Sequence, residues 1–106
     1  MTHDDYEIIF ETTAIRDLYG IFNYITDVLK APHAAQRILL TIEEHVMSIA
    51  YMLARHNVMR GEPYASMGVK IMPVENYNAL YVVDEPQQEI HILRILYNRR
   101  EWQNHL

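Results

Sequence analysis

The chain has 106 residues, half of them apolar, a net charge of −5 and no cysteine. This length fits one domain over residues 1–106, and the composition excludes a disordered chain, disulfides and thiolate metal sites. No apolar stretch approaches the ~20 residues that cross a bilayer, and the acidic first residues do not resemble a signal peptide, so we expect a cytoplasmic protein.

The first two predicted elements are a strand and a helix. Residues 6–10, Tyr-Glu-Ile-Ile-Phe, are β-branched and aromatic, which indicates a strand. Thr12 or Thr13 then offers a hydroxyl group that can cap the start of a helix. Apolar residues follow at steps of three and four, as on a helix that packs against a core. The pattern predicts a helix over residues 13–29.

A second helix is predicted after a very short connection. Lys30-Ala31-Pro32 interrupts the first apolar stripe, and proline suits the first turn of a new helix. Apolar residues of the same period then continue to residue 53. We therefore predict a helical hairpin made of residues 13–29 and 33–53.

Three strands are predicted in the second half of the chain, after a loop over residues 54–66. The first, residues 69–74, contains Pro73, which indicates an exposed edge or a bulge. Residues 77–84 include a continuous apolar run that indicates burial on both faces of a sheet. A short turn leads to the third strand, residues 89–97. Turns this short predict an antiparallel meander.

The element order β-α-α-β-β-β predicts an α+β fold. The helical hairpin should pack on one face of a curved, four-stranded, mainly antiparallel sheet, and the isolated first strand must join that sheet to cover its apolar face. We expect seven residues to be buried between helices and sheet: Ile21, Ile25, Ile42, Val46, Leu80, Val82 and Ile92.

Metal binding and nucleophilic catalysis find little support in the sequence. The six histidines are scattered along the chain, and no two of them stand at a helical i, i+4 spacing with a carboxylate partner. Ser48 and Ser66 lie outside any nucleophile-elbow pattern, and the three glycines are too scattered to cradle a phosphate. We therefore expect neither a metal nor a cofactor.

The candidate binding residues lie in the C-terminal third. Arg94 has apolar neighbours in its predicted strand and is expected to point out of the sheet. Arg99 and Arg100 follow at the end of the strand, and Trp102 closes the run. Guanidinium groups this close together can hold phosphates or carboxylates through fixed pairs of donors. Pairing with local acids on a solvated strand end is an equally good explanation.

Seven short motifs follow one another along the chain: Tyr6-Glu7-Ile8-Ile9, Asp17-Leu18 to Tyr24-Ile25, Gly68-Val69-Lys70, Pro73-Val74, Asn76-Tyr77, Tyr81 to Glu85 and Ile95 to Trp102. This ordered set resembles the RelE/ParE superfamily of bacterial toxins and agrees with the predicted element order. The resemblance implies a growth-inhibiting toxin of a type II toxin–antitoxin system, such as those that stabilise plasmids. A flexible antitoxin segment would fold onto the toxin and cover its working surface.

The resemblance leaves two targets open. RelE-like members cleave mRNA in the ribosomal A site, with basic side chains at the phosphate, and on that reading the catalytic residues would be Lys70 and Arg99. ParE-like members block DNA gyrase and have no known hydrolytic residues, so whether the chain is an enzyme depends on this choice. Contacts to the target or the antitoxin are expected at Lys70, Arg94, Arg99, Arg100 and Trp102.

The sequence departs from the RelE-like pattern at two points. Asn78 follows Tyr77 where RelE-like toxins carry an arginine, and the C-terminal tyrosine that acts on the proton is missing unless His105 or Tyr97 substitutes. Cleavage needs proton transfer and charge stabilisation together, and a net charge of −5 suits ribosomal RNA poorly. These departures favour gyrase inhibition. mRNA cleavage and a non-toxic, antitoxin-binding module are the alternatives.

The expected partner segment is disordered when free and net-acidic or amphipathic. Exposed apolar surface together with guanidinium groups suits a segment that folds as it binds. We expect the segment to cover the sheet and residues 94–100, in a hetero-oligomer of toxin and antitoxin.

Overall fold

The computed structural model describes residues 6–51, 62 and 64–98. The strands are β1 (Glu7–Phe10), β2 (Lys70–Val74), β3 (Tyr77–Asp84) and β4 (Glu89–Tyr97). The helices are α1 (Thr12–Asn23), the π-helix η2 (Tyr24–Val28), α2 (Pro32–Met47), the 3₁₀ helix η3 (Ser48–Tyr51) and α3 (Tyr64–Met67). Within the described ranges, no helix is long and apolar enough to span a membrane.

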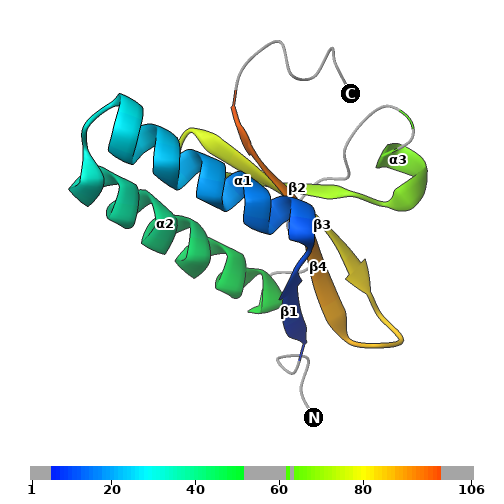
Figure 1. The fold of residues 1–106 in the computed structure, drawn as a ribbon. Coiled ribbons are helices and arrows are strands. Elements are labelled where there is room, and N and C mark those ends of the chain that lie inside the picture. The colour runs from blue at the N-terminus through cyan, green and yellow to red at the C-terminus, as the bar shows by residue number, and fades with distance from the viewer. Residues whose placement is uncertain (1–5, 52–61, 63, 99–106) are drawn as a thin grey trace.

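The four strands form one sheet in the order β1-β4-β3-β2. β1 runs parallel to β4, whereas the other two pairs are antiparallel. Figure 1 shows α1 and α2 side by side as a hairpin across the sheet, with α3 set apart from them. The predicted α+β fold is confirmed, and the parallel pair makes the sheet a mixed one.

The connection between the two long helices depends on a left-handed residue. Instead of continuing as an α-helix to residue 29, the first helix changes into η2, where Leu29 N–H donates to the Tyr24 carbonyl at 3.1 Å. Lys30 then has φ 57°, and Ala31 N–H donates to the Ile25 carbonyl at 3.0 Å, which closes the end of the helix. α2 begins directly at Pro32.

Apolar side chains are buried on both faces of the sheet. The larger cluster lies under the helices and includes Ile25, Ile42, Val46 and Ile92, with Ile21 partly buried against it, as predicted. The smaller cluster centres on Val69 and Leu80, with five partly buried residues packed against it: Tyr64, Ile71, Val82, Leu93 and Leu96.

The prediction that Leu80 and Val82 lie under the helices was wrong. Side chains alternate between the two faces of a strand, and the odd-numbered positions of β3, such as Tyr81, belong to the cluster under the helices. Leu80 and Val82 therefore lie on the opposite face, in the smaller cluster. The continuous apolar run of this strand reflects burial on both faces, as the sequence indicated.

A β-bulge in β4 sets which of its side chains face the helices. Leu80 pairs with Arg94 but Tyr81 pairs with Ile92, so Leu93 is an extra residue in β4. Because of the bulge, Ile92 and Ile95 both belong to the cluster under the helices although they are three residues apart. The sequence predicted a regular strand here.

Candidate functional site

Helix α1 covers the part of β4 that β1 leaves unpaired. β1 pairs with β4 only as far as Ile92, and beyond that point the backbone of β4 needs other hydrogen-bond partners. The Thr13 hydroxyl donates to the Leu93 carbonyl at 2.6 Å, and the Asp17 carboxylate accepts from Ile95 N–H at 2.9 Å. Two side chains about one turn apart on α1 thus protect the strand edge.

The predicted binding residue Arg94 is engaged with the same carboxylate. Its Nε lies 2.7 Å from Asp17 Oδ2 and its Nη2 lies 3.0 Å from Oδ1, a bidentate pair. The hydrogen bonds that Arg94 donates to the Asp17 carboxylate raise the pKa of Arg94 above its ordinary value. Arg94 is about half exposed, as expected for a side chain that points out of the sheet, but its guanidinium already holds α1 against β4.

Lys70 and Asn78, two positions of the RelE-like pattern, lie on opposite faces of the sheet. Lys70 pairs with Tyr81, so it lies on the face of the sheet that the helices cover. Asn78 pairs with Leu96, so it lies on the opposite face, where it is 6% exposed. The other predicted site residues, Arg99, Arg100, Trp102 and His105, lie outside the described residues.

Two tyrosines on β3 are not tuned for proton transfer near neutral pH. Burial raises the pKa of Tyr81 to about 12. Burial, with a smaller contribution from Tyr97, also raises the pKa of Tyr77. An efficient general acid or base has a pKa close to the operating pH, so both residues would serve poorly as a proton donor or acceptor in mRNA cleavage.

A groove of about 930 Å³ lies between α1–η2 and one end of the sheet. In Figure 1 the β2–β3 turn and the end of β4 lie behind α1, away from β1. We call this hollow the tyrosine groove, and its lining includes Arg16, Gly20, Tyr24, Tyr77, Leu96 and Tyr97. The rings of Tyr77 and Tyr97 meet edge to face, with centroids 5.5 Å apart. Sequence reasoning missed this groove because its residues come from five separate elements, namely α1, η2, α2, β3 and β4.

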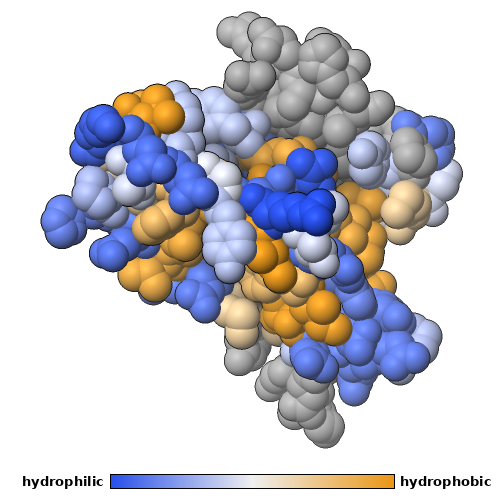
Figure 2. Space-filling view, viewed as in Figure 1, coloured by the Kyte–Doolittle hydropathy of each residue, from blue (hydrophilic) through white to orange (hydrophobic). Residues whose placement is uncertain are grey.

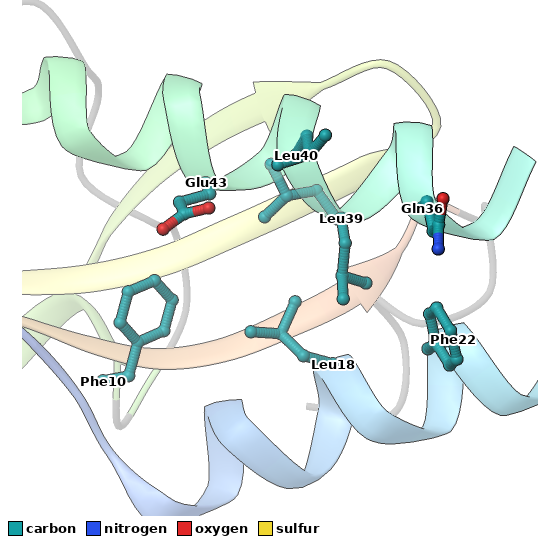
Figure 3. A pocket seen from close by; sticks show the side chains of 8 residues that line it. Phe10, Leu18, Phe22, Gln36, Leu39, Leu40 and Glu43 are labelled. Carbon is teal, nitrogen blue, oxygen red and sulfur yellow. The ribbon is translucent and has the colours of Figure 1, made fainter. Parts of the chain in front are cut away.

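A second groove, of about 440 Å³, separates α1 from α2. Figure 3 shows Leu18 and Leu39 pointing toward each other across it, with Phe10 and Phe22 along the same side as Leu18. Leu40 also lines this groove and is 59% exposed. Figure 2 shows apolar surface between the two long helices and again where α1 meets the strands. We call this second hollow the helix groove.

The structure also assembles a histidine–carboxylate cluster that the sequence did not reveal. His91 Nδ1 lies 2.6 Å from Glu11 Oε2, and its Nε2 lies 2.9 Å from Glu89 Oε1. Ligand atoms of Asp84, Glu89 and His91 all lie within 4.8 Å of one another. Glu89 and His91 are two residues apart on β4 and so share one face of the strand, and Asp84 pairs with Glu89 across the turn. The i, i+2 spacing of Glu89 and His91 is visible in the sequence, but it is a strand spacing and not the helical i, i+4 spacing. Carboxylates face both ring nitrogens, an arrangement that favours the protonated form of His91, because only that form donates from both nitrogens.

Three similar structures come from toxin–antitoxin systems. The chromosomal ParDE system from P. aeruginosa contains a chain that is 25% identical, with a TM-score of 0.73 over 92% of this chain and 100% of that one. The RelBE2 toxin–antitoxin complex from Mycobacterium tuberculosis gives 26% identity and a TM-score of 0.64, covering 87% and 96%. The archaeal RelE–RelB complex from Pyrococcus horikoshii OT3, 16% identical, shares the fold, with a TM-score of 0.54 over 90% and 97%.

The family comparison covers nearly the whole chain. No curated protein sequence gives a significant match. Residues 8–102 match the family model described as the ParE toxin of the type II toxin–antitoxin system, parDE. This match includes both long helices, the last three strands and β1 from its second residue onward. The chain therefore belongs to the ParE toxin family of type II toxin–antitoxin systems, within the RelE/ParE superfamily.

Proposed function

We propose that this toxin arrests growth by inhibiting DNA gyrase and that a cognate antitoxin neutralises it. Membership of the ParE family supports this choice of target. The similar structures from P. aeruginosa and M. tuberculosis are toxin–antitoxin systems, which supports the antitoxin as partner. The proposal places the protein among binding inhibitors rather than among nucleases.

The observation that carries the proposal is Asn78. An mRNA-cleaving relative would need a guanidinium at this position to stabilise the phosphate as negative charge develops. An amide cannot supply that charge, and loss of one such group commonly costs ~10²–10³ in rate. Arg94 offers no ready substitute because Asp17 holds its guanidinium. Lys70 lies on the other face of the sheet from Asn78.

The cations near the end of β4 fit recognition of a protein target. Arginine is enriched among the residues that carry most of the binding energy of protein interfaces. We expect that replacing both Arg99 and Arg100 with alanine lowers toxicity. Tyr97→Phe and His105→Ala should change toxicity little, because no proton transfer is required of either residue.

One experiment separates the two targets. The chain is expressed without its antitoxin, and plasmid supercoiling and mRNA integrity are followed in the arrested cells. The purified protein is then added to gyrase in a supercoiling assay and to a purified translation system. We expect loss of supercoiling activity with intact mRNA.

A RelE-like activity is the second candidate, favoured by the 26% identity to the RelBE2 complex. Codon-phased cleavage of ribosome-bound mRNA, abolished by Lys70→Ala or by Arg99→Ala, would overturn gyrase inhibition. Cells that grow normally while they accumulate the folded protein would instead indicate a module that binds antitoxin without being toxic.

A further inference from the structure

The tyrosine groove presents large side chains to solvent at the C-terminal end of the first helix. Tyr24 and Tyr97 are 54% and 52% exposed, and Leu29, which also lines the groove, is 54% exposed. Tyrosine combines a large apolar ring with a polar tip and is enriched at protein interfaces. The groove therefore has the composition of a binding surface, although the fold leaves these rings half uncovered.

Gly20 opens the floor of this groove. It lies in the last turn of α1, directly before the helix continues as η2, and glycine inside a continuous helix weakens it relative to alanine. Packing does not require the glycine, because a Cβ atom built there would meet nothing within 4 Å. The backbone conformation at Gly20 does not require a glycine either, because φ is not positive there. Among the described glycines, Gly68 is the one with a positive φ. A partner that passes close to the backbone of α1 would account for the missing side chain.

Arg16 gives the groove its charge. Arg16, Gly20 and Tyr24 follow at steps of four and so share one side of the helix. Two charged side chains line the groove, and one of them, Asp17, is neutralised by Arg94. Arg16 is exposed and forms no ion pair within the described residues. On a chain of net charge −5, this groove is therefore locally positive.

We propose that the tyrosine groove receives a segment of the cognate antitoxin that has a carboxylate for Arg16 and apolar side chains for the tyrosines. This inference rests on the proposed antitoxin partner and adds the place and chemistry of its contact. The segment passes over Gly20 with its backbone close to α1. The site overlaps the expected 94–100 region at Ile95, Leu96 and Tyr97, but Arg94 itself is not its anchor, because Asp17 already neutralises that guanidinium.

The charge of the groove favours the antitoxin segment over a second copy of this chain. A second toxin molecule has the same net charge of −5 and the same locally positive groove, which would lie against itself in a symmetric dimer. The helix groove is less suitable for an acidic segment, because Glu43 is the charged residue in its lining. A segment with acidic and apolar side chains is complementary both to the positive charge of the tyrosine groove and to its apolar rings.

The test compares three variants in binding titrations with the purified full-length antitoxin encoded beside this gene. Gly20→Gln places a good helix former in the open floor and should block the groove without weakening the fold. Arg16→Glu reverses the charge. Leu40→Gln is the matched control, since it makes a similar exposed change in the helix groove. Circular dichroism and urea unfolding of each free variant establish that it is folded.

We expect Gly20→Gln and Arg16→Glu each to weaken antitoxin binding by about tenfold or more, and Leu40→Gln to leave it within about twofold. Raised salt should reduce the difference between wild type and Arg16→Glu. Unchanged affinity in both groove variants, or an equal loss in Leu40→Gln, would overturn the inference while the antitoxin itself still binds. If the wild type does not bind the antitoxin, the proposed partner fails as well.

Analytical ultracentrifugation of the free toxin tests whether a second copy of this chain occupies the tyrosine groove instead. If the wild type self-associates and Gly20→Gln abolishes this, the groove is an interface between copies and the inference is wrong. A monomer in both cases is the expected result. Weakened gyrase inhibition by Gly20→Gln with unchanged antitoxin binding would assign the groove to the target and would likewise overturn the inference.

Discussion

His91 is held between carboxylates that come from distant parts of the chain. Glu11 precedes α1 and lies 80 positions away, whereas Glu89 is two residues away on β4. Hydrogen bonds to the carboxylates of Glu11 and then Glu89 raise the pKa of His91 above its ordinary value, against the opposing effect of burial. No periodicity in the sequence joins residues this far apart, so the pattern could not predict the contact.

The stabilisation from His91 should be lost as the pH rises. Because the folded-state pKa is raised, the contribution is fully present below the unfolded pKa of ~6.5 and disappears as the pH passes through the folded value. We expect the difference in unfolding free energy between wild type and His91→Gln to be largest near pH ~6 and to shrink at higher pH. Urea denaturation across this range measures it.

The matched control for this pH dependence is His33→Gln, at an exposed position of α2 with no ion pair in the described part of the chain. This variant should follow the wild type at every pH. A difference between wild type and His91→Gln that grows with pH would mean that the ring is bound as neutral imidazole and would contradict the prediction.

At the scale of elements, the apolar periods located every long helix and strand, but not the irregularities within them. The stripe over residues 13–29 continues smoothly although the structure changes to a π-helix at Tyr24. The bulge at Leu93 likewise leaves an unbroken apolar run in the sequence. Both depend on tertiary packing, to which a local period is insensitive.

The protection of β4 by α1 gives a prediction for Asp17. Asp17→Ala removes the partner of Arg94 and leaves Ile95 N–H, which belongs to a nearly buried residue, without its acceptor. We expect a loss of about 2–3 kcal/mol in unfolding free energy, measured by urea denaturation. Asp17→Asn should lose less, because its amide oxygen can still accept from Ile95.

Arg16→Ala is the control for this prediction, because it changes the neighbouring charged residue of α1. It should alter stability by no more than about 0.5 kcal/mol, as is usual for an exposed side chain. Equal losses in Arg16→Ala and Asp17→Ala would show that shortening a side chain on this turn of α1, rather than the contact with β4, accounts for the change.

At the scale of the whole molecule, the sequence predicted the element order and the position of the helices over the sheet. The sequence also predicted that β1 joins the sheet, but it did not predict which strand lies beside β1. The pairing of β1 with β4 depends on contacts between the two ends of the chain. The candidate site was predicted less well. Arg94 has an internal partner, and the tyrosine groove exists only after α1, η2, α2, β3 and β4 have come together.

Burial on both faces of the sheet predicts that mutations in the two clusters act independently on one cooperative unit. Ile42 lies under the helices and Leu80 lies on the opposite face, each 1% exposed. Ile42→Val should cost about 0.5–1.5 kcal/mol and Leu80→Ala about 2–5 kcal/mol, because each leaves a space in a packed cluster.

Since the two residues belong to different clusters, the costs should add within about 0.5 kcal/mol in the double variant. Urea unfolding followed by both near-ultraviolet and far-ultraviolet circular dichroism should give a single coincident transition for all three proteins. If Leu80→Ala instead produced an early transition in one signal alone, the cluster opposite the helices would unfold separately. The sheet would then not couple its two faces, and the stability of the protein would depend on the face under the helices.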